Sequence, residues 1–166
     1  MSKLLPFAVV GLLFAPLTVA HAQESTSAQL GQDDLLSLSQ RYAEAWSILN
    51  PDRVAALFAS DGRFAINGSE PAEGRDAIAE IARGFIEAVP DMVVAFDRLE
   101  WSRGHVLFHW RLTGTNIGPG GTGVAVRIRD VEAWIVGPGG LIVDSAGSFD
   151  GEVNTFTLAR ALGEPK

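Results

Sequence analysis

The spacing of the hydrophobic residues changes near Pro90, and this change constrains the fold more than any other feature of the sequence. Before Pro90, apolar residues recur every three or four positions, which is typical of helices that bury one face. After it, apolar and polar residues alternate in long runs, which indicates strands over 93–101, 105–115, 122–136 and 141–149. A helical half followed by an antiparallel meander predicts the α+β class, with the helices packed across one face of a curved sheet.

The helical half divides into three expected helices. The first begins at Asp33-Asp34, because acidic residues favour the positive end of the helix dipole. Asn50-Pro51 caps and starts a short second helix, which should end at Asp61-Gly62 and lead into a strand over 63–67. A third helix is expected over 75–88.

The first 22 residues have the layout of a secretory signal peptide. A charged start is followed by an apolar run, and Ala20-His21-Ala22 fits a cleavage site after Ala22. The apolar run is shorter than the ~20 residues that a membrane span needs, so we expect no membrane association after cleavage. The sequence therefore predicts a signal peptide at 1–22, a flexible leader at 23–32 and one domain at 33–166, in a periplasmic or secreted bacterial protein.

Composition narrows the class of function. The chain contains no cysteine, which excludes disulfides and thiolate chemistry. Its formal net charge is -7, and such a surface repels phosphate backbones, so we expect no nucleic-acid partner. With 47% hydrophobic residues, the chain has enough apolar side chains to form a core without disulfide bonds.

Two acids interrupt the apolar face of the expected strand over 122–136. By alternation, Asp130 and Glu132 share that face with Trp134. A buried carboxylate is costly unless it is paired or protonated, and such acids mark candidate sites. The alternative is a structural ion pair with Arg127, Arg129 or Arg75, which remains open at this point.

The two histidines of the domain do not predict a metal site. His105 and His109 share a strand face, but four residues of strand separate them by about 13 Å. Two ligands of one metal ion must lie much closer together. We therefore expect no metal and no organic cofactor.

Several segments together resemble the nuclear transport factor two-like superfamily, and within it the SnoaL-like polyketide cyclases and ketosteroid isomerases. The resemblance rests on "RYAEAWSILNPDRVAALFASDGRFAINGSEPAEGRDAI", "VPDM", Gly114-Thr115 and "GLIVDSAGSFD". It implies three helices against a curved antiparallel sheet, forming a cone-shaped α+β barrel around a blind apolar pocket. It also implies a homodimer and a small hydrophobic molecule as the ligand.

The resemblance assigns candidate catalytic residues. Ketosteroid isomerases carry a catalytic aspartate at the position of Ile66, so that base is absent here. Tyr42 matches their oxyanion-binding tyrosine, and Glu132 falls where they keep an aspartate protonated in an apolar site. SnoaL-like cyclases place an acid/base aspartate near the last strand, which corresponds to Asp150, with Asp144 as the alternative.

The function implied is a cofactor-free isomerase, cyclase or lyase acting on a hydrophobic, enolisable compound. The alternatives are a non-catalytic periplasmic binder of an apolar metabolite and a dimeric accessory module. Each candidate also has a purely structural explanation: Tyr42 as a core residue, Asp130 and Glu132 in ion pairs, and Asp150 as the cap of a segment over 152–162. The residues expected to face the pocket, of whose rings at least two should contact a ligand, are Trp46, Phe64, Ile66, Phe85, Trp110 and Trp134.

Overall fold

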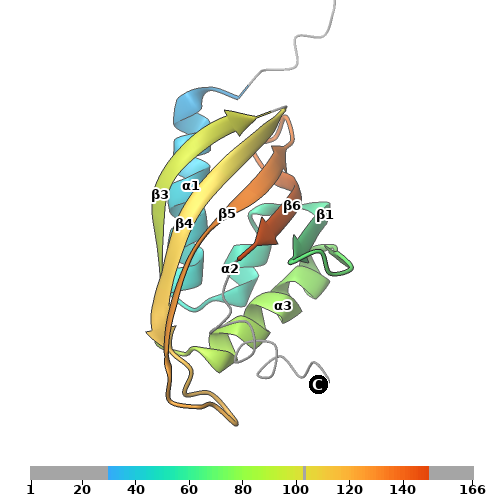
Figure 1. Ribbon diagram of the computed structural model, residues 1–166. Helices are drawn as coiled ribbons and strands as arrows, with labels where there is room; N and C mark the ends of the chain where they lie inside the picture. Colours follow the sequence, from blue (N-terminus) through green and yellow to red (C-terminus); the bar gives the residue numbers. More distant parts are fainter. Residues whose placement is uncertain (1–29, 103, 150–166) are drawn as a thin grey trace, which may run out of the picture.

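The computed structural model describes residues 30–102 and 104–149. Within them the helices are α1 (Gln32–Ser47), α2 (Pro51–Ala55) and α3 (Arg75–Ala88), and the strands are β1 (Phe58–Ile66), β2 (Ala72–Glu73), β3 (Val93–Ser102), β4 (His105–Thr115), β5 (Ala125–Val136) and β6 (Ile142–Ser148). The predicted α+β class is confirmed: the helices pack against one face of a curved sheet (Figure 1).

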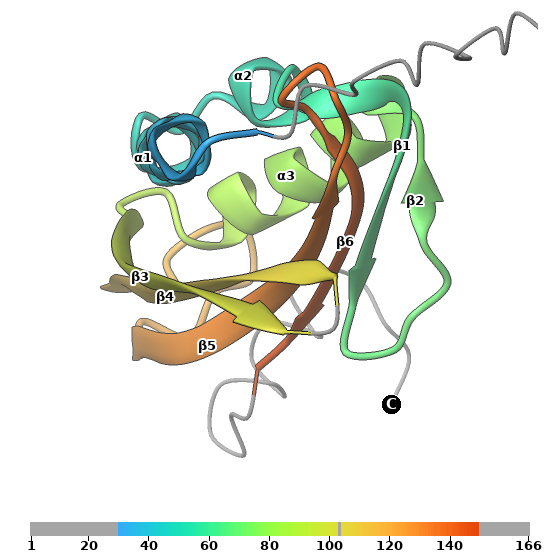
Figure 2. The ribbon, with the colours of Figure 1, turned by 90° about the horizontal axis from the view of Figure 1, so that it is seen from above.

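The sheet has the strand order β2-β1-β6-β5-β4-β3. Strands β3 to β6 form the expected antiparallel meander, but β1 runs parallel to β6, so the sheet is mixed rather than purely antiparallel. The sheet curves around α3 without closing into the barrel that the sequence suggested (Figure 2). Its concave face, toward the helices, therefore encloses the core.

The start of the sheet differs from the expectation. The sequence placed Phe58 on the second helix and the first strand at 63–67, whereas α2 spans a little more than one turn and β1 begins at Phe58. Phe58 pairs with Ile142 of β6, and the N–H of Ile142 donates to the carbonyl of Leu57 at 2.9 Å. Pairing with a strand far along the chain thus overrides the local helical spacing of the apolar residues.

The hairpin loop between β4 and β5 also extends further than expected. Strand β5 begins at Ala125 rather than at Thr122, because the buried side chain of Asn116 holds the loop before it. The side-chain Oδ1 atom of Asn116 accepts a hydrogen bond from the N–H of Thr122 at 2.9 Å. The backbone carbonyl of Asn116 accepts one from the N–H of Gly123 at 2.8 Å. A polar side chain therefore satisfies backbone groups that a strand would have paired.

The helix starts follow the sequence signals. The Asp34 carboxylate accepts a hydrogen bond from the N–H of Gly31 at 3.0 Å, and Asn50 accepts one from the N–H of Arg53 at 3.0 Å. Helix α3 begins after Gly74, whose φ of 81° lies in the left-handed region that glycine adopts without strain. The third helix therefore has the bounds that the sequence predicted.

An aromatic cluster joins α1 to the sheet. The ring of Tyr42 on α1 lies 5.0 Å from that of Trp134 and 5.4 Å from that of Phe108, and the last two rings stack at 4.4 Å. All three side chains are almost completely buried. Because closely packed aromatic rings leave few alternative rotamers, this cluster holds the hydroxyl of Tyr42 in a fixed position against β5.

No helix among the described residues is both long enough and apolar enough to cross a membrane.

Candidate functional site

The candidate site is built around the carboxyl group of Glu132 on β5, which is only 5% exposed. Its Oε2 atom accepts three hydrogen bonds: from the hydroxyl of Tyr42 at 2.9 Å, from the indole N–H of Trp134 at 3.0 Å and from the hydroxyl of Ser145 at 2.9 Å. Within the described part of the chain, no residue donates to its Oε1 atom. The two oxygens of one carboxyl group are therefore chemically different.

Strand register explains why these groups meet. Alternation along β5 directs Glu132 and Trp134 to the concave face, where α1 supplies Tyr42. Pairing with β6 sets Ser145 opposite Trp134 and Gly147 opposite Glu132. A Cβ atom on Gly147 would lie 3.1 Å from the Cγ atom of Glu132, so the glycine leaves the room that the glutamate side chain occupies.

Burial dominates the electrostatics of this site. Removal from water raises the pKa of Glu132 above its ordinary value, although the hydrogen bonds from Trp134, Ser145 and Tyr42 act in the opposite direction. Burial, together with the negative charge of Glu132, raises the pKa of Tyr42 well above its ordinary value. The tyrosine therefore stays protonated, and the environment favours the neutral form of the acid.

An apolar cavity of about 40 Å³ lies beside this group. A single water molecule needs ~10–15 Å³, so the space is larger than a packing defect. Tyr42 and Gly147, which both contact Glu132, form part of its wall. The other described residues that line it are Trp46, Phe64, Ile66, Phe85, Val94, Trp110, Leu112, Ile128 and Phe149.

The structure places most, but not all, of the expected pocket residues around this cavity. Trp46, Phe64, Ile66, Phe85 and Trp110 line it. Trp134 is fully buried behind the Tyr42 ring and contacts Glu132 rather than the open space.

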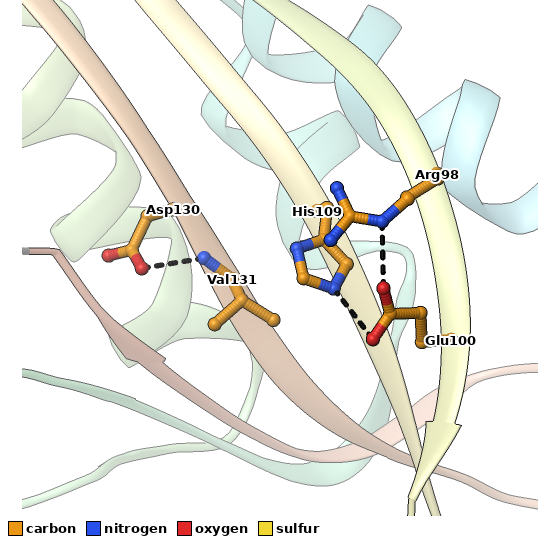
Figure 3. A network of polar contacts seen from close by, with 5 residues as sticks. All are labelled: Arg98, Glu100, His109, Asp130 and Val131. Atoms are coloured by element: carbon orange, nitrogen blue, oxygen red, sulfur yellow. Dashed lines mark hydrogen bonds and ion pairs between the residues drawn. The ribbon is translucent and has the colours of Figure 1, made fainter.

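The remaining candidate acids lie elsewhere. Asp130 is half-buried on the concave face opposite Trp110, and its Oδ1 atom accepts a hydrogen bond from the N–H of Val131 (Figure 3). Asp144 lies 3.8 Å from Arg63 in a partly exposed ion pair. Asp150 falls outside the described residues.

Among the described residues, Glu132 forms no ion pair with Arg75 or Arg129. Its hydrogen-bond partners are all uncharged, whereas Arg75 donates to the carbonyl of Phe58 at 2.9 Å and Arg129 lies 4.0 Å from Asp97. Burial and three uncharged donors, rather than a cation, thus surround Glu132, and burial raises its pKa.

The histidines lie on the other face of the sheet, as their alternation with apolar residues indicated. His109 lies 3.5 Å from Glu100, which also accepts a hydrogen bond from Arg98 at 2.7 Å (Figure 3). Over residues 30–102 and 104–149, no three His, Asp or Glu side chains gather closely enough to hold a metal ion.

The sequence patterns did not identify Ser145 as a hydrogen-bond donor to Glu132. They also did not identify Gly147 as the residue that leaves room for the Glu132 side chain. A signal for both exists: once β5 and β6 are read as a hairpin, each residue falls opposite a member of the site. A register shift near Ile135 and Val136 hides this pairing, because counting outward from the turn gives positions that are one residue out.

Residues 39–145 match the SnoaL-like domain family, and the chain belongs to this family. No curated protein matches the chain.

Solved structures with similar folds include both enzymes and proteins of no stated activity. A protein from Jannaschia sp. CCS1 assigned to the SnoaL-like polyketide cyclases superposes with a TM-score of 0.64 at 15% identity, covering 83% of this chain and 99% of that one. A protein from Catenulispora acidiphila DSM 44928 with a ketosteroid isomerase-like fold, in complex with trimethylamine, gives 0.59 at 17% identity, over 77% and 93% of the two chains. The epoxide hydrolase/cyclase-like enzyme SalBIII, which acts in pyran ring formation in salinomycin, gives 0.59 at 18% identity, over 71% and 92%. At these identities the likeness establishes the fold.

Proposed function

We propose that this protein binds a small hydrophobic, enolisable compound in the apolar cavity and isomerises, cyclises or eliminates it by acid/base chemistry without a cofactor. The observation that carries the proposal is the 2.9 Å hydrogen bond between Tyr42, which lines the cavity, and the buried Glu132. The family assignment and the cyclase-like enzymes among the proteins of similar fold support it.

The geometry of Glu132 suggests how the pair acts. Three donors already occupy Oε2, so a proton on the neutral acid binds to Oε1. An acid with that proton is a hydrogen-bond donor in a water-excluded site. When a base removes a proton next to a carbonyl, negative charge develops on the carbonyl oxygen. Tyr42 would stabilise it by turning its single O–H from Oε2 of Glu132 to that oxygen, and Glu132 by donating its own proton. We propose Asp150 as the base, on the resemblance to the cyclases, with Asp130 as the other candidate.

Exchange of a carbon-bound proton tests this chemistry without knowledge of the natural substrate. Cyclopentanone in D₂O loses its α-proton NMR signals as it enolises, and the wild-type protein should accelerate that loss over buffer. Tyr42→Phe removes one donor and should slow the catalysed exchange by a factor on the order of 10². Asp150→Asn should abolish it, whereas Trp101→Phe, an exposed position outside the cavity, should not change it.

A non-catalytic binder is the second candidate. Tyr42 is the one titratable side chain among the described residues that line the cavity, and this favours binding without turnover. Cyclopentanone that binds without accelerated exchange would support the binder and contradict the enzyme.

Export and dimerisation are further parts of the proposal. Support for export is the signal-peptide pattern of residues 1–22, and the mass of the protein recovered from its host should correspond to a chain that begins at Gln23. A dimer is proposed from the resemblance alone, and sedimentation of the purified protein tests it.

A further inference from the structure

Trp110 carries a polar group that nothing in the described chain satisfies. The side chain lies on β4, is only 8% exposed and lines the cavity. Its indole Nε1 atom is buried and has no hydrogen-bond partner among the described residues. An indole N–H is a donor only, so it requires an acceptor oxygen or nitrogen.

A second indole shows that the fold can satisfy such a donor. Trp134 on β5, next to β4, is equally buried, and its N–H donates to Glu132 at 3.0 Å. Most buried donors in proteins are paired in this way, and an unpaired one destabilises the folded state. The unpaired N–H of Trp110 is therefore an exception that needs an explanation.

The neighbours of Trp110 do not supply an acceptor. Across β3 it faces Phe96, and across β5 it faces Asp130, whose Oδ1 atom accepts a hydrogen bond from the N–H of Val131. Neither carboxylate oxygen of Asp130 accepts a hydrogen bond from the indole. Leu112 and Ile128, which lie along the same cavity wall, are apolar. The cavity is the open space beside this side chain.

We infer that the ligand of this cavity carries a carbonyl or ether oxygen that accepts a hydrogen bond from the indole N–H of Trp110. This inference rests on the proposed function, because it takes the cavity to be the binding site. No described residue that lines the cavity carries a charge at neutral pH, so the ligand class is an uncharged, apolar compound with an acceptor oxygen. Trp110 would then select the oxygenated compound over a hydrocarbon of the same shape.

A matched pair of probes tests the inference. Cyclopentanone and methylenecyclopentane have nearly the same shape, but only the ketone has an acceptor oxygen. In a ¹⁵N-labelled protein the indole signals of the four tryptophans report on each side chain, and Trp110→Phe assigns the signal of Trp110. The wild type should bind the ketone about fivefold or more tightly than the alkene, and only the ketone should move the Trp110 N–H proton signal downfield.

Variants locate the preference. Trp110→Phe retains an aromatic ring but has no N–H, so the preference for the ketone should fall well below that of the wild type. Trp101→Phe changes a tryptophan that is 54% exposed and lies outside the cavity, and it should keep the preference for the ketone. The signal shift in the wild type requires no substitution, so the test remains valid if Trp110→Phe fails to fold.

The outcomes separate this inference from the proposed function. If both probes bind equally well and neither moves the Trp110 signal, the inference is wrong while the cavity remains a binding site. If neither probe binds the wild type, the cavity is not a binding site for such compounds, and the proposed function fails with the inference. A preference that Trp110→Phe retains in full would contradict the inference, because the ketone oxygen would then accept its hydrogen bond from another donor, such as Tyr42.

Discussion

Glutamates on the two faces of the sheet lie in opposite environments. On the concave face, Glu132 has no cationic partner in the described part of the chain, and burial raises its pKa. On the convex face, Glu100 is exposed, and its hydrogen bond with Arg98 lowers its pKa. Solvent and a cation keep the outer carboxylate ionised, whereas the helices remove both from the inner one. Position on the pleat, not residue type, therefore decides which acid is suited to proton chemistry.

The largest effect should come from removing the inner acid. Glu132→Ala leaves the donors of Tyr42, Trp134 and Ser145 without their acceptor and opens additional space in the core. The free energy of unfolding in urea should fall by about 2–4 kcal/mol. Asp97→Ala, on the convex face, is the matched control and should cost much less. Equal losses at the two positions would contradict the difference between the faces.

Filling the space beside the inner acid should have the next largest effect. In Gly147→Ala the added methyl would lie 3.1 Å from the Cγ atom of Glu132, so one side chain must move. We expect a loss of about 1–3 kcal/mol, measured by thermal unfolding. The double variant with Glu132→Ala should recover part of that loss, because the clash is then gone. A Gly147→Ala protein as stable as the wild type would show that β6 shifts to accept the methyl group without loss of stability.

The two faces should also respond to pH with opposite signs. Because the folded-state pKa of Glu132 is raised, its cost to stability is absent below its ordinary value of 4.5 and grows as pH rises from there toward the folded-state pKa. Glu100, whose folded-state pKa is lowered, stabilises the fold above its ordinary value, and this is lost as pH falls through the folded-state pKa. Urea unfolding from acidic to neutral pH should therefore show that Glu132→Gln gains stability relative to wild type as pH rises. A constant difference between the two proteins would show that folding does not change the pKa of Glu132.

The smallest effect should come from the ion pairs of the convex face. Asp97 lies 3.2 Å from Arg111, and both side chains remain partly exposed to solvent. A double-mutant cycle on this pair should give a coupling of about 0.2–1 kcal/mol, which salt reduces. A coupling of several kcal/mol would mean that this face is buried, as a dimer interface would require.

The sequence predicted the elements whose signals are local. Helix α3 and strand β4 have the predicted bounds, because Gly74 and Pro90 flank the helix and strict alternation defines the strand. Alternation along β5 also assigned Glu132 to the apolar face, where the structure has it.

The errors come from interactions between distant segments. The start of β1 at Phe58 depends on pairing with β6, and the role of Ser145 depends on a register shift that no local pattern reports. The cavity itself depends on how α1 and α3 pack against the sheet, which local spacing does not determine. The catalytic and binding roles given to the site residues stay predictions.

The parallel pairing of β1 with β6 has a consequence for how the molecule folds. Strand β1 cannot complete its pairing until β6 is present, and Tyr42 and Glu132 are 90 residues apart along the chain. Contacts between such distant segments slow folding, because a long loop must close before they form. The site therefore depends on contacts that require most of the domain to be present. A growing chain that ends before Ser145 already carries Tyr42 and Glu132, but it lacks Ser145, Gly147 and Phe149 and cannot yet assemble the site.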